Sequence, residues 1–114
     1  IKDIQELTNR VIALRDARDW SQFNNPKDNA LSLVLESTEV LEHFQWKNGN
    51  EIDEYVKNNK KQIEKELADV LYWVLLMSKD MDIDISNSLI EKISENEKKY
   101  PVDKFKGIAK KYNK

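Results

Sequence analysis

Glycine and proline are scarce in this chain, and their scarcity limits what it can fold into. The 114 residues contain only two of each. Pro26, Gly49 and Pro101, with the polar residues around them, are the main interruptions. Between these points apolar residues recur at helical spacing, and no segment shows the alternation of a half-buried strand. We therefore predict an all-α fold, with residues 1–114 forming a single domain.

Four segments carry apolar residues at helical spacing. The first has Ile4 and Leu7 on one face. The third contains the run VLYWVLLM, which is apolar on every side, so we expect that helix to be buried over most of its circumference. Either Asp82 or Asp84 is a suitable N-cap for the fourth. The predicted helices span 2–18, 28–46, 60–80 and 84–99, with a polar connection over 47–59 holding at most one short helical turn and a flexible Lys-rich tail over about 102–114.

The composition excludes several classes of protein. There is no cysteine, so disulfides and thiolate metal sites are excluded. The net charge of −2 gives no electrostatic reason to expect binding to nucleic acid or to an anionic membrane. The longest apolar run, VLYWVLLM, is much shorter than the roughly 20 residues that a membrane-spanning helix needs. Since no signal peptide is apparent either, we expect a cytoplasmic protein.

Two of the predicted helices carry carboxylates beside their apolar faces. Glu36 and Glu39 lie three residues apart on the second helix, and Glu66 and Asp69 do so on the third. Residues at this spacing project from the same side of a helix, so antiparallel packing would bring all four side chains together. Four carboxylates at low dielectric need a counter-cation. An all-oxygen site favours Mg²⁺, with Mn²⁺ as a substitute, and Mg²⁺ often bridges carboxylates to phosphates.

The alternative is that these carboxylates are ordinary solvated charges at the edges of helices. Lys60, Lys61 and Lys65 are close enough in sequence to pair with them. Acidic pairs at this spacing are common on helix surfaces in a chain so rich in charged residues. Spacing alone leaves both interpretations open.

The sequence around the carboxylates resembles a known family. The stretches ALSLVLESTEVLEHFQWK and EKELADVLYWVLLM are similar to the ExxE and ExxD motifs of the all-α nucleoside triphosphate pyrophosphohydrolases, the MazG-like and dCTP-pyrophosphatase-like proteins. RDWSQF before the first motif and NEKKYP at the end of the fourth helix extend the resemblance over about residues 4–101. It implies a four-helix bundle subunit that assembles into a dimer or a dimer of dimers, in which a neighbouring chain completes the base pocket.

The resemblance also implies an activity. Such proteins hydrolyse nucleoside triphosphates to the monophosphate and pyrophosphate with Mg²⁺, and so control or clean the nucleotide pool. By resemblance, the metal-binding and catalytic residues are Glu36, Glu39, Glu66 and Asp69. One of the glutamates, with Glu39 as the first candidate, would orient or deprotonate the attacking water. Deoxynucleotides such as dCTP are the expected substrates.

The tryptophans are expected near the base of the nucleotide. By resemblance, Trp20 and Trp46 line the base pocket, and Trp73 stands where relatives often carry tyrosine. An aromatic face accepts a stacked base with about 1–3 kcal/mol. The alternative for each tryptophan is packing in the core.

Polar residues complete the expected site. Asn24 stands where dCTP-specific relatives carry histidine, which leaves the base preference open. Asn96 and Lys99 resemble positions that contact the phosphates, although a lysine there also suits a helix C-terminus. His43, the only histidine, lies four residues after Glu39 and could approach the metal, but a surface or packing role is the simpler interpretation.

Two other functions are conceivable for a helical protein with clustered carboxylates. A di-iron carboxylate bundle takes Glu-x-x-His from each of two helices, which a chain with one histidine cannot supply. A non-catalytic helical interaction module derived from the same fold remains as the alternative. In either case a chain of this length cannot easily bury a helix that is apolar all round, so we expect at least a homodimer.

Overall fold

The computed structural model describes residues 3–108, and every regular element in this range is helical. The elements are α1 (Ile4–Ala17), the 3₁₀ helix η1 (Trp20–Phe23), α2 (Pro26–Glu42), α3 (Asn50–Asn58), α4 (Lys60–Asp80), α5 (Ile85–Lys99) and α6 (Val102–Phe105). The predicted all-α fold is confirmed for these residues. The short α6 lies within the predicted tail, whose residues 109–114 are outside the described range.

Side-chain caps fix where two of the helices begin. The side chain of Asn25 accepts a hydrogen bond from the backbone N–H of Asp28, and Pro26 is the first residue of α2. This helix therefore starts two residues before the predicted start at 28. At α5 the cap is Asp84, one of the two predicted candidates, which accepts from the backbone N–H of Asn87.

The segment after α2 differs from the prediction. α2 ends at Glu42 and not at 46, and the chain turns through the intervening residues. The polar connection contains α3, a helix of nine residues where at most one short turn is predicted. Ile52 and Tyr55, three residues apart, lie on one face of α3, which can pack. The acidic residues in its first turn stabilise the helix by interacting favourably with its dipole. The helix is short and mostly polar, so the spacing of its few apolar residues is a brief signal.

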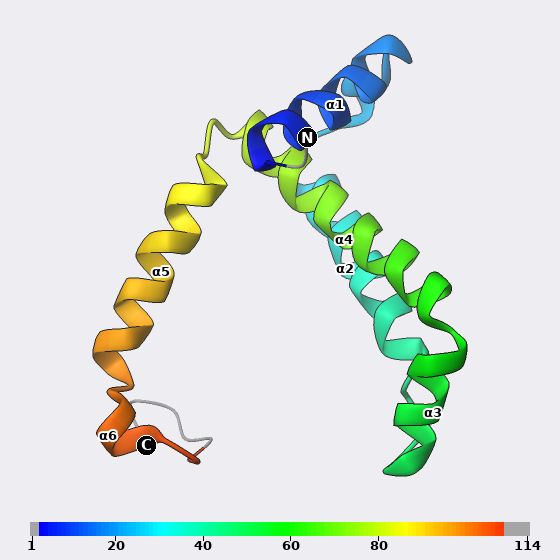
Figure 1. The fold of residues 1–114 in the computed structure, drawn as a ribbon. Coiled ribbons are helices and arrows are strands. Elements are labelled where there is room, and N and C mark those ends of the chain that lie inside the picture. Colours follow the sequence, from blue (N-terminus) through cyan, green and yellow to red (C-terminus); the bar gives the residue numbers. More distant parts are fainter. Residues whose placement is uncertain (1–2, 109–114) are drawn as a thin grey trace. The chain divides into compact units, whose positions relative to one another are not determined.

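α4 is the central helix of the first part of the chain. α2 lies beside it in the antiparallel direction, and α1 and α3 also pack against it (Figure 1). The C-terminal half of α4 is buried, with Leu75 and Leu76 only 2% and 1% exposed. Leu67 and Leu71 in the first half are 52% and 42% exposed. The burial expected all along this helix is therefore found only in its second half.

The described residues fall into two compact units that divide after Asp82. The first unit contains α1 to α4 with η1, and the second contains α5 and α6. Within the second unit, the rings of Tyr100 and Phe105 meet edge to face with their centroids 5.0 Å apart. No helix found between residues 3 and 108 is both long enough and apolar enough to cross a bilayer.

Candidate functional site

Three carboxylates converge between α2 and α4. Glu36 and Glu39 come from α2, and Asp69 comes from the antiparallel α4. One carboxylate oxygen of each side chain lies within 4.8 Å of those of the other two. We call these three residues the carboxylate triad. Because hard divalent cations prefer several oxygen ligands around one point, the triad is a suitable arrangement for holding one.

Glu36 is the least exposed member of the triad. Its Oε2 is buried and accepts no hydrogen bond from the described residues. Burial raises the pKa of the Glu36 carboxyl above its ordinary value of 4.5, and the charges of Glu39 and Asp69 raise it further. A buried carboxylate oxygen without a partner is costly, and a cation would remove that cost. The side chains present therefore fit a hard divalent ion such as Mg²⁺.

Glu66, the fourth predicted ligand, lies beside the triad and not within it. Its Oε2 is hydrogen-bonded to Nε2 of His43. The other ring nitrogen of His43, Nδ1, lies 2.5 Å from the hydroxyl oxygen of Tyr55. Glu66 and Glu39 line the same open hollow of about 430 Å³, together with His43 and Tyr55. The charge of Glu66 also raises the pKa of Glu36, by less than burial and the charges of Glu39 and Asp69 do. The fourth carboxylate therefore adjoins the other three.

The raised pKa of Glu36 predicts how the metal-free protein responds to pH. In EDTA at pH 7.5, Glu36→Gln should unfold at a higher temperature than the wild type, because it removes a carboxylate that the fold keeps in an unfavourable place. The protonated Glu36 contributes stability that is fully present below the ordinary pKa of 4.5 and is lost as the pH rises through the higher pKa of the folded state. The advantage of Glu36→Gln should therefore shrink as the pH is lowered towards 4.5, which thermal unfolding at several pH values measures.

The control for this experiment is Glu64→Gln on α4. Glu64 has a half-exposed side chain that pairs with Lys61 at 3.5 Å, and surface pairs of this kind contribute little to stability. Its unfolding temperature should stay close to that of the wild type at each pH. If Glu36→Gln were less stable than the wild type at pH 7.5 in EDTA, the electrostatic account of the triad would be wrong.

A second hollow, of about 290 Å³, shares Asp69 with the triad. Three of the residues predicted to bind substrate, Trp20, Asn24 and Trp73, line it. The rings of Tyr72 and Trp73 are edge to face, with centroids 5.3 Å apart. We call this the aromatic hollow, and its full lining is Leu14, Arg15, Trp20, Asn24, Asp69, Tyr72, Trp73 and Leu76. Its size and aromatic walls suit a small planar group adjacent to the carboxylates.

Arg15 is a buried cation in the wall of the aromatic hollow. It is 7% exposed, and its Nη1 donates to both carboxylate oxygens of Asp80, at 2.6 and 2.8 Å. The same nitrogen lies 3.4 Å from Oδ1 of Asn24. Because a guanidinium only donates hydrogen bonds, this contact turns the amide oxygen of Asn24 towards Arg15. The ion pair thus joins α1 to the end of α4 and holds Asn24 in place.

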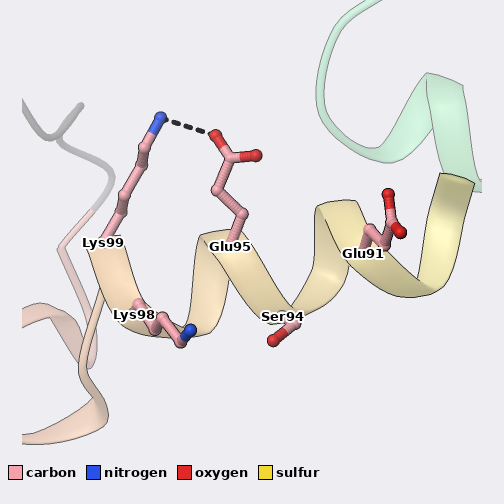
Figure 2. A pocket seen from close by; sticks show the side chains of 5 residues that line it. All are labelled: Glu91, Ser94, Glu95, Lys98 and Lys99. Carbon is pink, nitrogen blue, oxygen red and sulfur yellow. Dashed lines mark ion pairs between the residues drawn. The ribbon is translucent and has the colours of Figure 1, made fainter.

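The other predicted substrate residues lie apart from these two hollows or in the second unit. Trp46 is 84% exposed in the turn after α2 and lines neither hollow. Asn96 and Lys99 belong to α5, in the second unit. There Lys99 pairs with Glu95 at 2.9 Å beside an open hollow on the same helix (Figure 2). Phosphate contacts by Asn96 and Lys99 stay a prediction.

Several residues in or beside the aromatic hollow and the hollow at Glu66 were not predicted from the sequence. Tyr55 lies in the segment predicted to be a polar connection, and its spacing of three from Ile52 was the available signal of a helix. Arg15 and Asp80 are 65 residues apart, and no local pattern pairs them. His43 continues the row of Glu36 and Glu39 along α2, four residues after Glu39. That spacing places His43 near the carboxylates but does not indicate its hydrogen bond to Glu66.

The chain is similar to known proteins in both sequence and fold. The MazG-like family model matches residues 31–114. Proteins named dCTP pyrophosphatase 1 from Mus musculus and Rattus norvegicus are 32% and 33% identical over 98% of this chain. The chain spans about 65% of the length of each of these relatives. The crystal structure of a pyrophosphatase from Archaeoglobus fulgidus superposes with a TM-score of 0.82 at 32% identity, covering 89% of this chain and 94% of that one.

Proposed function

This chain belongs to the MazG-like family, and from that premise we propose that it is a metal-dependent nucleoside triphosphate pyrophosphohydrolase. The observation that carries the proposal is the carboxylate triad, in which Glu36 has a buried oxygen that no residue within 3–108 hydrogen-bonds. The aromatic hollow that shares Asp69 offers a place for a base next to the polyphosphate. Pyrophosphatase relatives and a similar pyrophosphatase structure support the same reaction class.

Mg²⁺ is the proposed cofactor, with Mn²⁺ as a substitute. Glu36, Glu39 and Asp69 would hold it, and Glu66 is proposed as the fourth ligand. When bound, such an ion neutralises phosphate charge and lowers the pKa of a water. Glu66 adjoins this group from the neighbouring hollow. Glu39, which is exposed and lines that hollow, is our candidate for orienting or deprotonating the attacking water. The products would be a nucleoside monophosphate and pyrophosphate.

The aromatic hollow is the proposed base site. Trp20 and Trp73 supply faces on which a base can stack. The amide oxygen of Asn24 faces Arg15. The NH₂ group of Asn24 is therefore the part of this side chain that can donate hydrogen bonds to a base. Those donors match the ring nitrogen and carbonyl acceptors of cytosine. A cytosine deoxynucleotide such as dCTP, the substrate in the names of the relatives, is therefore the first substrate to test.

Pyrophosphate release from a panel of the common dNTPs and NTPs tests the proposal. We expect release of pyrophosphate, and not of free phosphate, with Mg²⁺ present and none in EDTA. The main alternative is a non-catalytic helical interaction module. Failure to release pyrophosphate from any nucleotide, in protein shown by circular dichroism to be helical, would favour that alternative. A nucleotide-pool role and a cytoplasmic location are proposed together with the activity.

Truncation of Trp73 should weaken nucleotide binding. In Trp73→Ala the KM for the best dNTP should rise about 5- to 150-fold, the equivalent of losing a stacking contact of about 1–3 kcal/mol. Trp73→Phe should recover most of the loss because it keeps an aromatic face. Phe23→Ala is the control, since Phe23 is 66% exposed and does not line the hollow. An unchanged KM in Trp73→Ala would exclude the aromatic hollow as the base site.

We also propose that the protein is at least a homodimer that packs through α2. Leu31, Val34, Leu35 and Leu41 are each more than half exposed and fall on one face of this helix. A contiguous apolar face of this kind is typical of an interaction surface, and a second copy could cover it symmetrically. Such an assembly is also the proposed means of bringing Trp46 to the base site of a neighbour.

Light scattering after size exclusion tests this assembly. At micromolar concentration the wild type should elute with at least twice the mass of one chain, and Val34→Lys should shift the population towards the monomer. Gln5→Lys, an exposed change on α1 outside this apolar face, is the control and should leave the mass unchanged. A wild type that is monomeric at this concentration would contradict the proposal.

A further inference from the structure

His43 belongs to neither the triad nor the aromatic hollow, yet it is one of the most connected side chains of the first unit. Its side chain is 11% exposed. Nε2 is bonded to Oε2 of Glu66, and Nδ1 lies 2.5 Å from the Tyr55 hydroxyl. The result is a hydrogen-bonded chain that runs from α3 through the end of α2 to α4.

The chemistry of the two partners assigns the protons along this chain. The carboxylate of Glu66 can only accept, so Nε2 of His43 carries the hydrogen that is donated to it. A neutral imidazole then has its lone pair on Nδ1, and the Tyr55 hydroxyl donates to that nitrogen. Every group in the chain is satisfied in this arrangement. The carboxylate of Glu66 therefore selects the tautomer, and Tyr55 supports it by donating to the nitrogen that carries the lone pair.

Tyr55 is itself held in place. The ammonium group of Lys47 lies 4.2 Å from the centroid of the Tyr55 ring, within the range of a cation–π contact. The same group donates to the backbone carbonyl of His43 at 2.8 Å. Lys47 thus contacts both of the other residues and restricts their separation. His43, Lys47 and Tyr55 therefore form one connected group beside Glu66 of α4.

We propose that His43 and Tyr55 position Glu66 for the bound divalent cation, an inference that rests on the proposed function. The bond to His43 engages one oxygen of Glu66 and orients the carboxylate in the hollow that it shares with Glu39. Partners that hold a metal-binding carboxylate from behind commonly change metal affinity or activity by about 10- to 100-fold. Because its Nε2 is engaged with Glu66, His43 acts as a positioning residue and not as a metal ligand.

Nuclear magnetic resonance can read the proton assignment directly, because His43 is the only histidine. A long-range ¹H–¹⁵N spectrum of ¹⁵N-histidine-labelled full-length protein, metal-free at pH 7.5, should show the neutral tautomer protonated at Nε2. In Tyr55→Phe the Nδ1 partner is lost, and we expect a mixture of the two tautomers. A wild-type ring protonated at Nδ1 alone would overturn the proposal.

Cation binding tests the positioning role without relying on catalysis. Mn²⁺ is titrated into nucleotide-free protein, and free Mn²⁺ is followed by electron paramagnetic resonance. His43→Leu should raise the dissociation constant about 10- to 100-fold. His43→Gln should stay within about 3-fold of the wild type, because its amide can donate to Glu66 while accepting from Tyr55. Equal Mn²⁺ affinity in His43→Leu and the wild type would refute the proposal.

Kinetics distinguishes this inference from the proposed function. In His43→Leu the Mg²⁺ concentration for half-maximal rate should rise by the same factor as the Mn²⁺ dissociation constant, whereas the KM for nucleotide at saturating Mg²⁺ should change little. Should His43→Leu fail to fold, Tyr55→Phe gives the same readouts with the ring retained. A wild type that binds Mn²⁺ and has the expected tautomer, but hydrolyses no nucleotide, would contradict the activity and leave the positioning of Glu66 supported.

Discussion

Glu36→Gln should lower kcat/KM for the best nucleotide by about 10³-fold or more. Glutamine has nearly the shape of glutamate, so the packing between α2 and α4 is retained while one negative charge is removed from the triad. Glu36 contributes the buried oxygen that has no hydrogen-bond partner among the described residues, and a neutral amide is a weaker ligand than a carboxylate for a small divalent cation. Initial rates of pyrophosphate release at increasing Mg²⁺ measure the effect.

The same change on an exposed glutamate of α4 provides the comparison. Glu64→Gln removes a charge that pairs only with Lys61 at the surface, and its kcat/KM should stay within about 2-fold of the wild type. Asp69→Asn should behave like Glu36→Gln, because it removes a triad carboxylate from the facing helix. If Glu36→Gln and Asp69→Asn both hydrolysed nucleotide at the wild-type rate, the triad would not be the metal centre.

Leu76→Ala should lower the free energy of unfolding by about 3 kcal/mol, within the 2–5 kcal/mol found for buried leucines in general. Leu76 is 1% exposed and lies in the buried half of α4. Its side chain also lines the aromatic hollow, so a cavity there would remove support from the wall that holds Trp73. Urea unfolding at fixed protein concentration in EDTA measures the change.

Leu76→Met separates lost volume from a general intolerance of substitution. Methionine conserves most of the volume of leucine and usually costs less than about 1.5 kcal/mol in a core. The two variants should therefore differ clearly at the same position. A loss below about 1 kcal/mol in Leu76→Ala would mean that α4 is not the core helix described here.

Much of the helical framework could be predicted from the spacing of apolar residues. The predicted helix over 60–80 coincides with α4 (Lys60–Asp80), and α5 begins at a predicted cap. Helix α3 is short and has four charged side chains among nine residues, so the spacing of Ile52, Tyr55 and Val56 is a signal too brief to predict a helix by itself. Its packing on α4 stabilises it. The early end of α2 follows from the turn that leads into α3.

The site shows a similar division between local and long-range information. The spacing of Glu36, Glu39 and Asp69 suffices to place them together once α2 and α4 pack in antiparallel directions. The hydrogen bond that engages Glu66 depends on His43, which directly follows α2, and on Tyr55 from α3. Arg15 and Asp80 pair across 65 residues. These contacts depend on tertiary packing, so no sequence window contains them.

Asp69 contributes to the triad and also to the wall of the aromatic hollow. Under the proposed function, a cation bound at the triad alters the free energy of nucleotide binding in the aromatic hollow, because Asp69 belongs to both. Thermodynamic reciprocity then requires that, if the cation increases nucleotide affinity by some factor, the nucleotide increases cation affinity by the same factor. The protein would then take up metal and nucleotide as a cooperative pair, each binding more tightly when the other is present.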